Sequence, residues 1–143
     1  MAALDELIDR QPPECGGRVA VLKLDVEGFE LFALEGLQRS LRARRLRHLL
    51  FEFGGTERWS RHNQSAGAGL AALNMLSDCG YEVRYLHTHG KHATLRQSVA
   101  QSWVIVDENH FGVRLVYSRV PRRDLAALIH SRVDLNVWAT SLA

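Results

Sequence analysis

Two apolar runs flank an amphipathic segment in the first third of the chain. Residues 18–25 form a nearly continuous apolar run, which is typical of a strand covered on both faces of a parallel sheet. Leucines recur at helical spacing through 27–45 and form one apolar stripe. A second apolar run, 48–53, ends at two glycines. The pattern predicts two adjacent parallel strands that the helix joins in a right-handed crossover.

In the rest of the chain, segments with the apolar spacing of a helix alternate with segments typical of a strand. The elements expected there are, in order, a polar loop at 56–65, a helix at 66–79, a strand at 81–86, a polar hairpin or loop at 87–96, strands at 101–107 and 113–117, a helix at 121–132 and a short strand at 136–140. A short acidic helix or turn is also expected at 4–7. This order predicts an α/β fold, with antiparallel edge strands added by the tail, in a single domain spanning 1–143.

Composition narrows the class of protein. Of the 143 residues, 46% are hydrophobic and 24% are charged, which excludes a disordered tail or a fibrous repeat. The formal net charge of +2 gives no reason to expect a nucleic acid or an anionic membrane as partner. No apolar run approaches the length of a membrane span, and residues 1–10 do not resemble a secretory signal. The two cysteines, Cys15 and Cys79, are expected to be reduced thiols in a cytoplasmic protein.

Charged residues interrupt the apolar pattern where the first two strands end. Asp25 closes the first run, and Glu27 follows at the start of the expected helix. Ligands of open α/β sheets bind outside the carboxyl ends of the strands, so an active site is expected here. Lys23 and Glu52 lie within the strands expected to be buried, and a buried charge needs a partner. We therefore expect these two residues to form an ion pair, or each to have another polar partner.

The segment around these charges resembles the central signature of FkbM-type methyltransferases that use S-adenosylmethionine. Residues 21–31 read Val-Leu-Lys-Leu-Asp-Val-Glu-Gly-Phe-Glu-Leu, and Leu-Glu-Gly follows at 34–36. The family has a hydrophobic strand ending in Lys-Ile-Asp-Val-Glu-Gly and then a helix with Leu-x-Gly. Further similarities, in the family's order, are Leu-Asp-Glu-Leu-Ile at 4–8, Leu-Leu-Phe-Glu at 49–52, Gly-Tyr-Glu-Val at 80–83 and Asn-Val-Trp-Ala at 136–139.

The resemblance implies the later strands and helices of a partial Rossmann-like, class I methyltransferase sheet. It also implies methyl transfer from S-adenosylmethionine to a hydroxyl oxygen of a small-molecule or glycan-like acceptor. Asp25 is the first candidate for a catalytic group that faces the cofactor or acceptor, Glu27 the second and Glu52 the third. Asp25 and Glu27 are also the candidate cofactor-binding residues.

The chain departs from the family because no Gly-rich half precedes the signature. In the family that half supplies the first strands and the turn that hold the cofactor. We therefore expect S-adenosylmethionine to bind weakly or not at all, and the edge of the strand at 18–25 to be exposed. An exposed edge predicts self-association or a partner chain that covers it. The alternative is a non-catalytic or truncated α/β module derived from such an enzyme.

Three further motifs are interpreted as structural. Gly-Ala-Gly-Leu-Ala-Ala at 67–72 fits a nucleotide-loop pattern, but it follows no strand and is expected to begin a helix. Three histidines within 87–92 could hold a metal ion and are interpreted as a solvated hairpin. Arginines at 42–47 could bind phosphate or nucleic acid and are interpreted as a solvated helix end.

Overall fold

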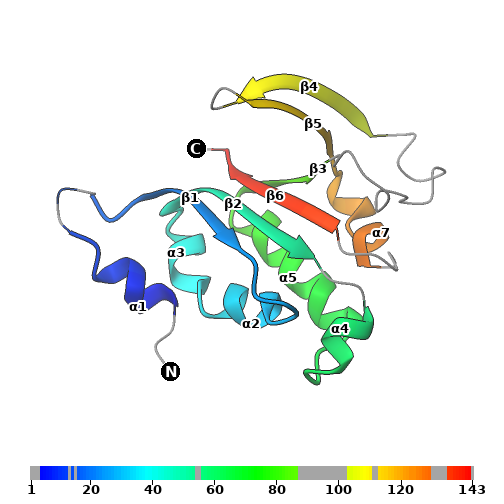
Figure 1. The fold of residues 1–143 in the computed structure, drawn as a ribbon, viewed down its shortest axis with the longest axis horizontal. Helices are drawn as coiled ribbons and strands as arrows, with labels where there is room; N and C mark the ends of the chain where they lie inside the picture. The colour runs from blue at the N-terminus through cyan, green and yellow to red at the C-terminus, as the bar shows by residue number, and fades with distance from the viewer. Residues whose placement is uncertain are drawn as a thin grey trace.

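One mixed sheet organises the molecule (Figure 1). The computed structural model describes residues 4–12, 14, 16–53, 56–86, 103–110, 113–129 and 135–142. The strands are β1 (Val19–Leu24), β2 (Leu46–Phe53), β3 (Tyr81–Leu86), β4 (Val104–His110), β5 (Val113–Arg119) and β6 (Leu135–Ser141). They pair in the order β1-β2-β6-β3-β5-β4.

Short helices connect and cover the strands. They are α1 (Leu4–Asp9), α2 (Glu30–Glu35), α3 (Gln38–Arg42), α4 (Thr56–Ser60), α5 (Ala66–Asp78), the 3-10 helix η2 (Arg122–Asp124) and α7 (Ala126–Ile129). Figure 1 shows α2, α3 and α5 on one side of the sheet. No helix in the described ranges is long and apolar enough to cross a membrane.

The pairing of the first two strands confirms the predicted parallel unit. β1 and β2 run parallel, with Val21 beside His48 and Lys23 beside Leu50. The tail adds antiparallel strands as expected, but only β4 lies at the edge, because β5 pairs with both β3 and β4. The last strand, β6, lies inside the sheet, antiparallel to both β2 and β3. A fully buried Val137 faces the helix layer, and a buried Trp138 faces the opposite side. Such a strand suits a central position.

The predicted helix at 27–45 is two helices. α2 ends at Glu35, and α3 begins two residues after Gly36. The carboxylate of Asp5, on α1, accepts hydrogen bonds from the backbone N–H groups of Arg39 and Ser40, both at 2.9 Å. These are N–H groups that a helix start leaves without an intrahelical partner. The new helix start is therefore stabilised by a cap from a segment more than 30 residues away.

The prediction of a polar loop at 56–65 is wrong for its first half, because Thr56–Ser60 form α4. Trp59 explains the difference, because its side chain is fully buried and packs edge-on against Phe53 at 4.6 Å between ring centroids. Gly69 makes room for it: a Cβ there would lie 2.5 Å from the Trp59 ring. The glycine-containing segment at 67–72 is the first part of α5, as predicted, and the Ser65 side chain caps it.

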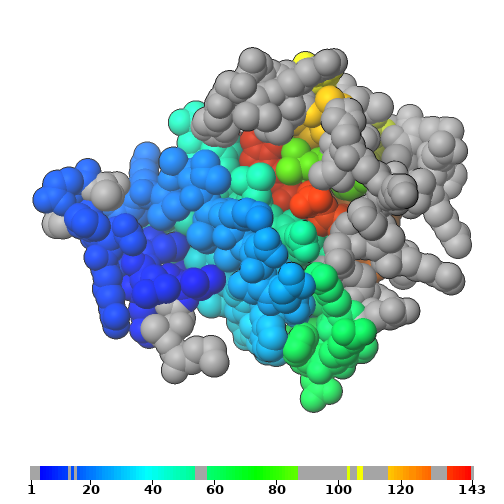
Figure 2. All heavy atoms as spheres, viewed as in Figure 1, coloured from blue at the N-terminus to red at the C-terminus, as the bar shows by residue number. Residues whose placement is uncertain are grey.

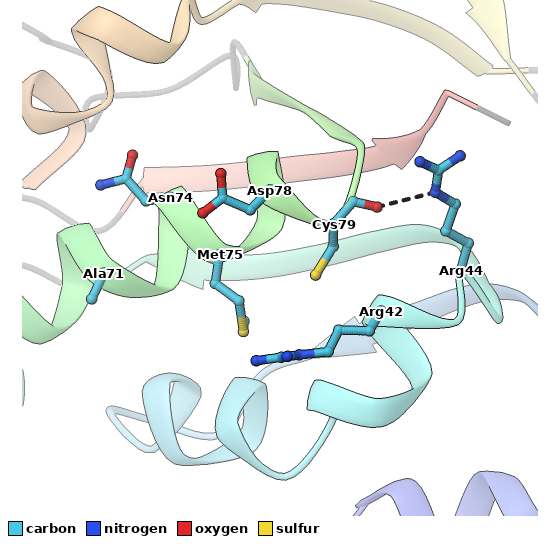
Figure 3. Close-up of a pocket in the computed structure, with 7 residues that line it drawn as sticks. All are labelled: Arg42, Arg44, Ala71, Asn74, Met75, Asp78 and Cys79. Atoms are coloured by element: carbon cyan, nitrogen blue, oxygen red, sulfur yellow. Dashed lines mark hydrogen bonds between the residues drawn. The ribbon is translucent and has the colours of Figure 1, made fainter.

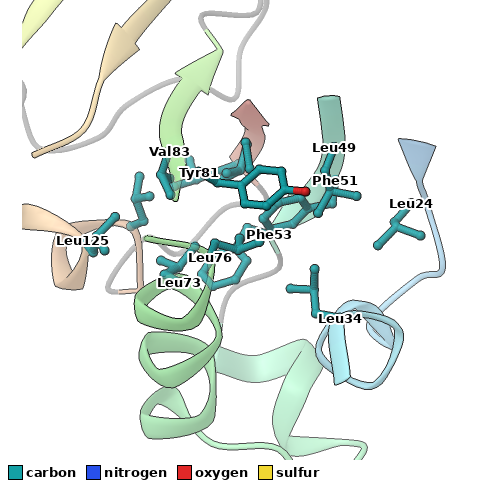
Figure 4. Packing of buried hydrophobic residues seen from close by; sticks show 14 of the residues in the cluster. Leu24, Leu34, Leu49, Phe51, Phe53, Leu73, Leu76, Tyr81, Val83 and Leu125 are labelled. Atoms are coloured by element: carbon teal, nitrogen blue, oxygen red, sulfur yellow. The ribbon is translucent and has the colours of Figure 1, made fainter. Parts of the chain in front are cut away.

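The core lies between the helices and one face of the sheet (Figure 4). Its centre is formed by fully or almost fully buried apolar side chains from β2, β6, α2 and α5, among them Leu34, Leu49, Phe51, Phe53, Leu73, Leu76 and Val137.

The opposite face of the sheet is uncovered at β1, where Val21 is 44% exposed and Lys23 is exposed. Figure 2 shows atoms of β1 at the molecular surface. The prediction that this strand is covered on both faces is therefore wrong. One edge of β1 is also free of a neighbouring strand among the described residues.

Candidate active site at the carboxyl ends of β1 and β2

A tight turn carries the signature residues from β1 into α2. Asp25 directly follows the strand, and Glu27 and Gly28 both have positive φ, at 51° and 102°. Glu27 was expected in the first helical turn and lies instead in this connection, three residues before α2 begins. A non-glycine residue in the left-handed region costs about 1–3 kcal/mol and is found mostly where function or surrounding structure requires it.

Two ion-pair groups hold the charged residues of the turn. Lys23 Nζ lies 2.8 Å from Asp25 Oδ2. Arg58, from α4, joins the other two carboxylates: its Nη2 lies 3.0 Å from Glu27 Oε2, and its Nη1 lies 3.5 Å from Glu52 Oε2. The three candidate carboxylates therefore lie at one edge of the sheet, each beside a cation.

Lys23 and Glu52 do not form an ion pair with each other. Each has another polar partner instead, which is the second arrangement that we predicted: Lys23 pairs with Asp25 and Glu52 with Arg58. The premise that Lys23 is buried is wrong, because its side chain is 68% exposed on the uncovered face. Its hydrogen bond to Asp25 is the main reason that the pKa of Lys23 is raised, and the charge of Glu52 adds a smaller contribution in the same direction.

Glu30 is a site residue that the sequence reasoning did not identify. It begins α2, is completely buried, and its Oε1 accepts a hydrogen bond of 3.0 Å from the Gly28 N–H. Within the described ranges, its Oε2 has no hydrogen-bond partner. The available signal is a carboxylate two residues after a glycine in a strand-to-helix turn. Glu30 fixes the conformation of the turn that presents Asp25 and Glu27.

Arg58 and His62 were also missed, because their segment was expected to be a loop. The His62 ring lies over Phe29 at 4.0 Å between centroids. A Cβ at Gly28 would lie 3.1 Å from His62 Cδ2, so the turn and the segment after α4 are in close contact. The helix α4 thus supplies both the cation that joins two carboxylates and the surface against which the turn packs.

The site opens to solvent. The side chains of Asp25, Glu27 and Glu52 are 43%, 74% and 32% exposed, and exposed Val26 and Phe29 lie beside them. Carboxylates in such a position can accept a proton or bind a cationic or hydroxyl-bearing ligand.

Over the described part of the chain, no three His, Cys, Asp or Glu side chains are grouped to hold a metal ion. The histidines at 87–92 lie outside the described residues, as does Cys15, whereas Cys79 is a free thiol.

Comparison with known protein families agrees with the chemistry of this edge. The methyltransferase FkbM domain matches residues 3–83, more than half of the chain, and this segment includes the turn and all three carboxylates. No curated protein and no solved structure matches the chain. The mixed sheet with its layer of helices is compatible with a partial Rossmann-like methyltransferase fold. The chain belongs to the FkbM methyltransferase family.

Proposed function

We propose that the carboxyl ends of β1 and β2 form the active site of an O-methyltransferase that uses S-adenosylmethionine. The observation that carries the proposal is the convergence of Asp25, Glu27 and Glu52 at one sheet edge, within the segment that matches the family. The acceptor is a hydroxyl group of a small molecule or glycan. Membership of a methyltransferase family supports the reaction class, and the carboxylates support a hydroxyl acceptor because they can take up its proton.

The residues present fit the cofactor that the family uses. S-adenosylmethionine carries a sulfonium, an ammonium and ribose hydroxyls, and carboxylates suit all of these groups. Asp25 and Glu27 would hold it, because they are the most exposed of the three carboxylates and flank the turn. When bound, the cofactor supplies an electrophilic methyl group.

The protein's own side chains have two tasks: they orient the carboxylates of the site, and one of them accepts the proton of the acceptor hydroxyl. Asp25 is the first candidate to accept the proton of the acceptor hydroxyl, because Lys23 occupies only its Oδ2. Arg58 orients Glu27 and Glu52 and so limits their freedom. Alignment of the reacting atoms is the main requirement of methyl transfer, and a site of fixed side chains meets it.

The described residues form one wall of this site. Working ligand sites bury about 70–90% of the ligand surface, and the exposure of Asp25 and Glu27 is far from such enclosure. We propose that further polypeptide covers the free edge of β1, either a second copy of the chain or a partner. Apolar residues that remain exposed near this edge, Val21, Val26, Phe29 and Phe32, support the proposal.

Isothermal titration with S-adenosylhomocysteine, together with sedimentation velocity on the same samples, tests the proposal. We expect weak, saturable binding that Asp25→Asn abolishes and that the matched control Asp78→Asn leaves within twofold. Asp78 is an exposed residue that pairs with Arg122 away from the site. No heat of binding at millimolar ligand would support the alternative, a non-catalytic module. Micromolar binding by a monomer would contradict the idea of a single wall.

A further inference from the structure

A cavity rich in arginine lies at the other end of β1 and β2. It measures about 690 Å³ and is bordered by the amino ends of these strands and the end of β6. Ten residues in the described part of the chain line it; none of these is acidic, and five are arginines: Arg18, Arg44, Arg45, Arg47 and Arg84. The interpretation of 42–47 as a solvated helix end is therefore incomplete. Only Arg42 of that cluster belongs to α3, and three of its arginines line the cavity.

Two of the five guanidinium groups form ion pairs within the fold. Arg45 pairs with Asp9, and Arg84 pairs with Glu82. Both contacts use acidic residues that do not line the cavity. These two arginines contribute shape and hydrogen-bond donors more than net charge.

The other three arginines have no carboxylate beside them among the residues that the structure describes. Arg18 and Arg47 are exposed, and neither forms an ion pair with another described residue. Arg44 donates its Nε to the neutral carbonyl of Cys79 at 3.2 Å, and its terminal nitrogens point away from that carbonyl (Figure 3). Three positive charges therefore border one concave surface without local compensation. The chain as a whole carries a formal charge of only +2, so this concentration is a local feature.

The floor of the cavity is held rigidly by buried polar groups. Arg84, 9% exposed, lies over the rings of Tyr117 and Trp138, with its Cζ 4.5 and 4.3 Å from their centroids, and the two rings pack edge-on against each other. His48, 7% exposed, accepts a hydrogen bond from Trp138 Nε1 at its Nδ1, which also lies 3.0 Å from Thr140 Oγ1. Side chains fixed in this way need little reordering when a ligand binds, which lowers the cost of binding.

We propose that this cavity binds a small molecule that carries two or more linked phosphate groups. Planar guanidinium forks match phosphate oxygens in pairs, and the volume falls within the range of small-molecule sites. Three uncompensated positive charges suit a diphosphate better than a single phosphate. The site is separate from the methyl-transfer edge, because Arg47 and Glu52 are five residue steps apart along β2, which is about 16 Å.

The test is isothermal titration of the whole chain with sodium pyrophosphate, and with orthophosphate for comparison. We expect saturable pyrophosphate binding that weakens at least tenfold in the double variant Arg18→Glu with Arg47→Glu. The control Arg61→Glu with Arg123→Glu makes the same change in net charge on exposed residues outside the cavity, and it should stay within twofold. If the charge reversal fails to fold by circular dichroism, the neutral pair Arg18→Gln with Arg47→Gln decides the question, again with at least a tenfold loss expected.

Three results would overturn the proposal. The first is no saturable binding of pyrophosphate, and the second is an equal loss of affinity in the cavity variant and its control. The third is tight binding of a single-stranded oligonucleotide with none of pyrophosphate, which would indicate an extended polyanion surface. Asp25→Asn should leave pyrophosphate binding unchanged, so failure of this site and failure of the proposed methyltransferase site are distinguishable.

Discussion

The two ends of the β1–β2 pair handle charge in opposite ways. At the carboxyl end, Asp25, Glu27 and Glu52 each lie within 3.5 Å of a lysine or arginine nitrogen. At the amino end, Arg18 and Arg47 have no acidic partner in the described part of the chain. Paired carboxylates are held in place for chemistry, whereas unpaired cations of one sign create a field that attracts an anion. The comparison separates a site built for positioning from one built for electrostatic capture.

The largest expected effect concerns the rigid floor at the amino end. Arg84→Met removes a nearly buried guanidinium and leaves the partly buried Glu82 with Arg119 as its remaining ion-pair partner among the described residues. Removing one partner of a buried pair is costly, so we expect a loss of about 3 kcal/mol in the free energy of unfolding. Urea denaturation measures it, and Arg119→Met, at the exposed partner, is the control with a loss below about 1 kcal/mol. Equal losses in the two variants would show that the arginine floor has no special role.

The next effect concerns the turn at the carboxyl end. Gly28→Ala places a Cβ 3.1 Å from His62 Cδ2 on a backbone with φ of 102°. We expect a loss of about 1–3 kcal/mol, because both the backbone and the neighbouring ring must adjust. Gly67→Ala is the matched control: it lies in α5 with only an ordinary contact, and it should be neutral or stabilise the fold by up to about 1 kcal/mol. A neutral Gly28→Ala would mean that the turn is not held by its surroundings.

A smaller loss of stability is expected at Asp5, an acidic residue whose role is structural and which lies outside the candidate site. Burial opposes ionisation of Asp5, but hydrogen bonds from Ser40 and Arg39 outweigh it and lower the pKa of Asp5 below its ordinary value of 3.8. Asp5→Asn should therefore cost about 1 kcal/mol at neutral pH, as expected for a helix cap. Because the folded-state pKa is lowered, this contribution is complete above pH 3.8 and is lost as the pH falls through the lower value. The difference in the free energy of unfolding between the two proteins should shrink as the pH falls from 7 to 2.5; a constant difference would contradict the capping account.

The smallest effect on stability is expected at Lys23. Its ion pair with Asp25 is exposed, so Lys23→Met should leave the urea midpoint unchanged within error. The same variant removes the hydrogen bond that orients Asp25, so it should alter binding of S-adenosylhomocysteine by about threefold or more. Val21→Met, on the same face of β1, is the control for added apolar bulk. A large loss of stability in Lys23→Met would indicate that the pair is structural.

The sequence predicts the β1–α–β2 unit well because its signals are local. A continuous apolar run and a leucine stripe depend only on neighbouring residues, and both survive in the fold although Gly36 and the Asp5 cap divide the helix. The position of β6 could not be predicted, because the pairing of strands far apart in the chain leaves no mark in the local pattern. The exposed face of β1 was missed for a related reason, since an apolar run does not say what covers it.

Some residues of the candidate site could likewise be predicted from local sequence signals, and others could not. Asp25, Glu27 and Glu52 could be found because charges at the ends of apolar strands are conspicuous. Arg58 could not, because α4 is five residues long and is held by Trp59 packing against Phe53 and Gly69. Contacts of that kind depend on tertiary structure and are invisible to periodicity.

One measurement tests the contrast between the two ends most directly. A ¹⁵N-labelled sample is titrated with S-adenosylhomocysteine and then, in a second aliquot, with pyrophosphate, and amide shifts are mapped onto the fold. The account predicts that the first ligand perturbs residues 24–29 and Glu52, and that the second perturbs Arg18, Arg47 and the end of β6. Asp25→Asn should remove only the first response. Both ligands acting at the same end, or the first giving no response at 24–29, would contradict the account.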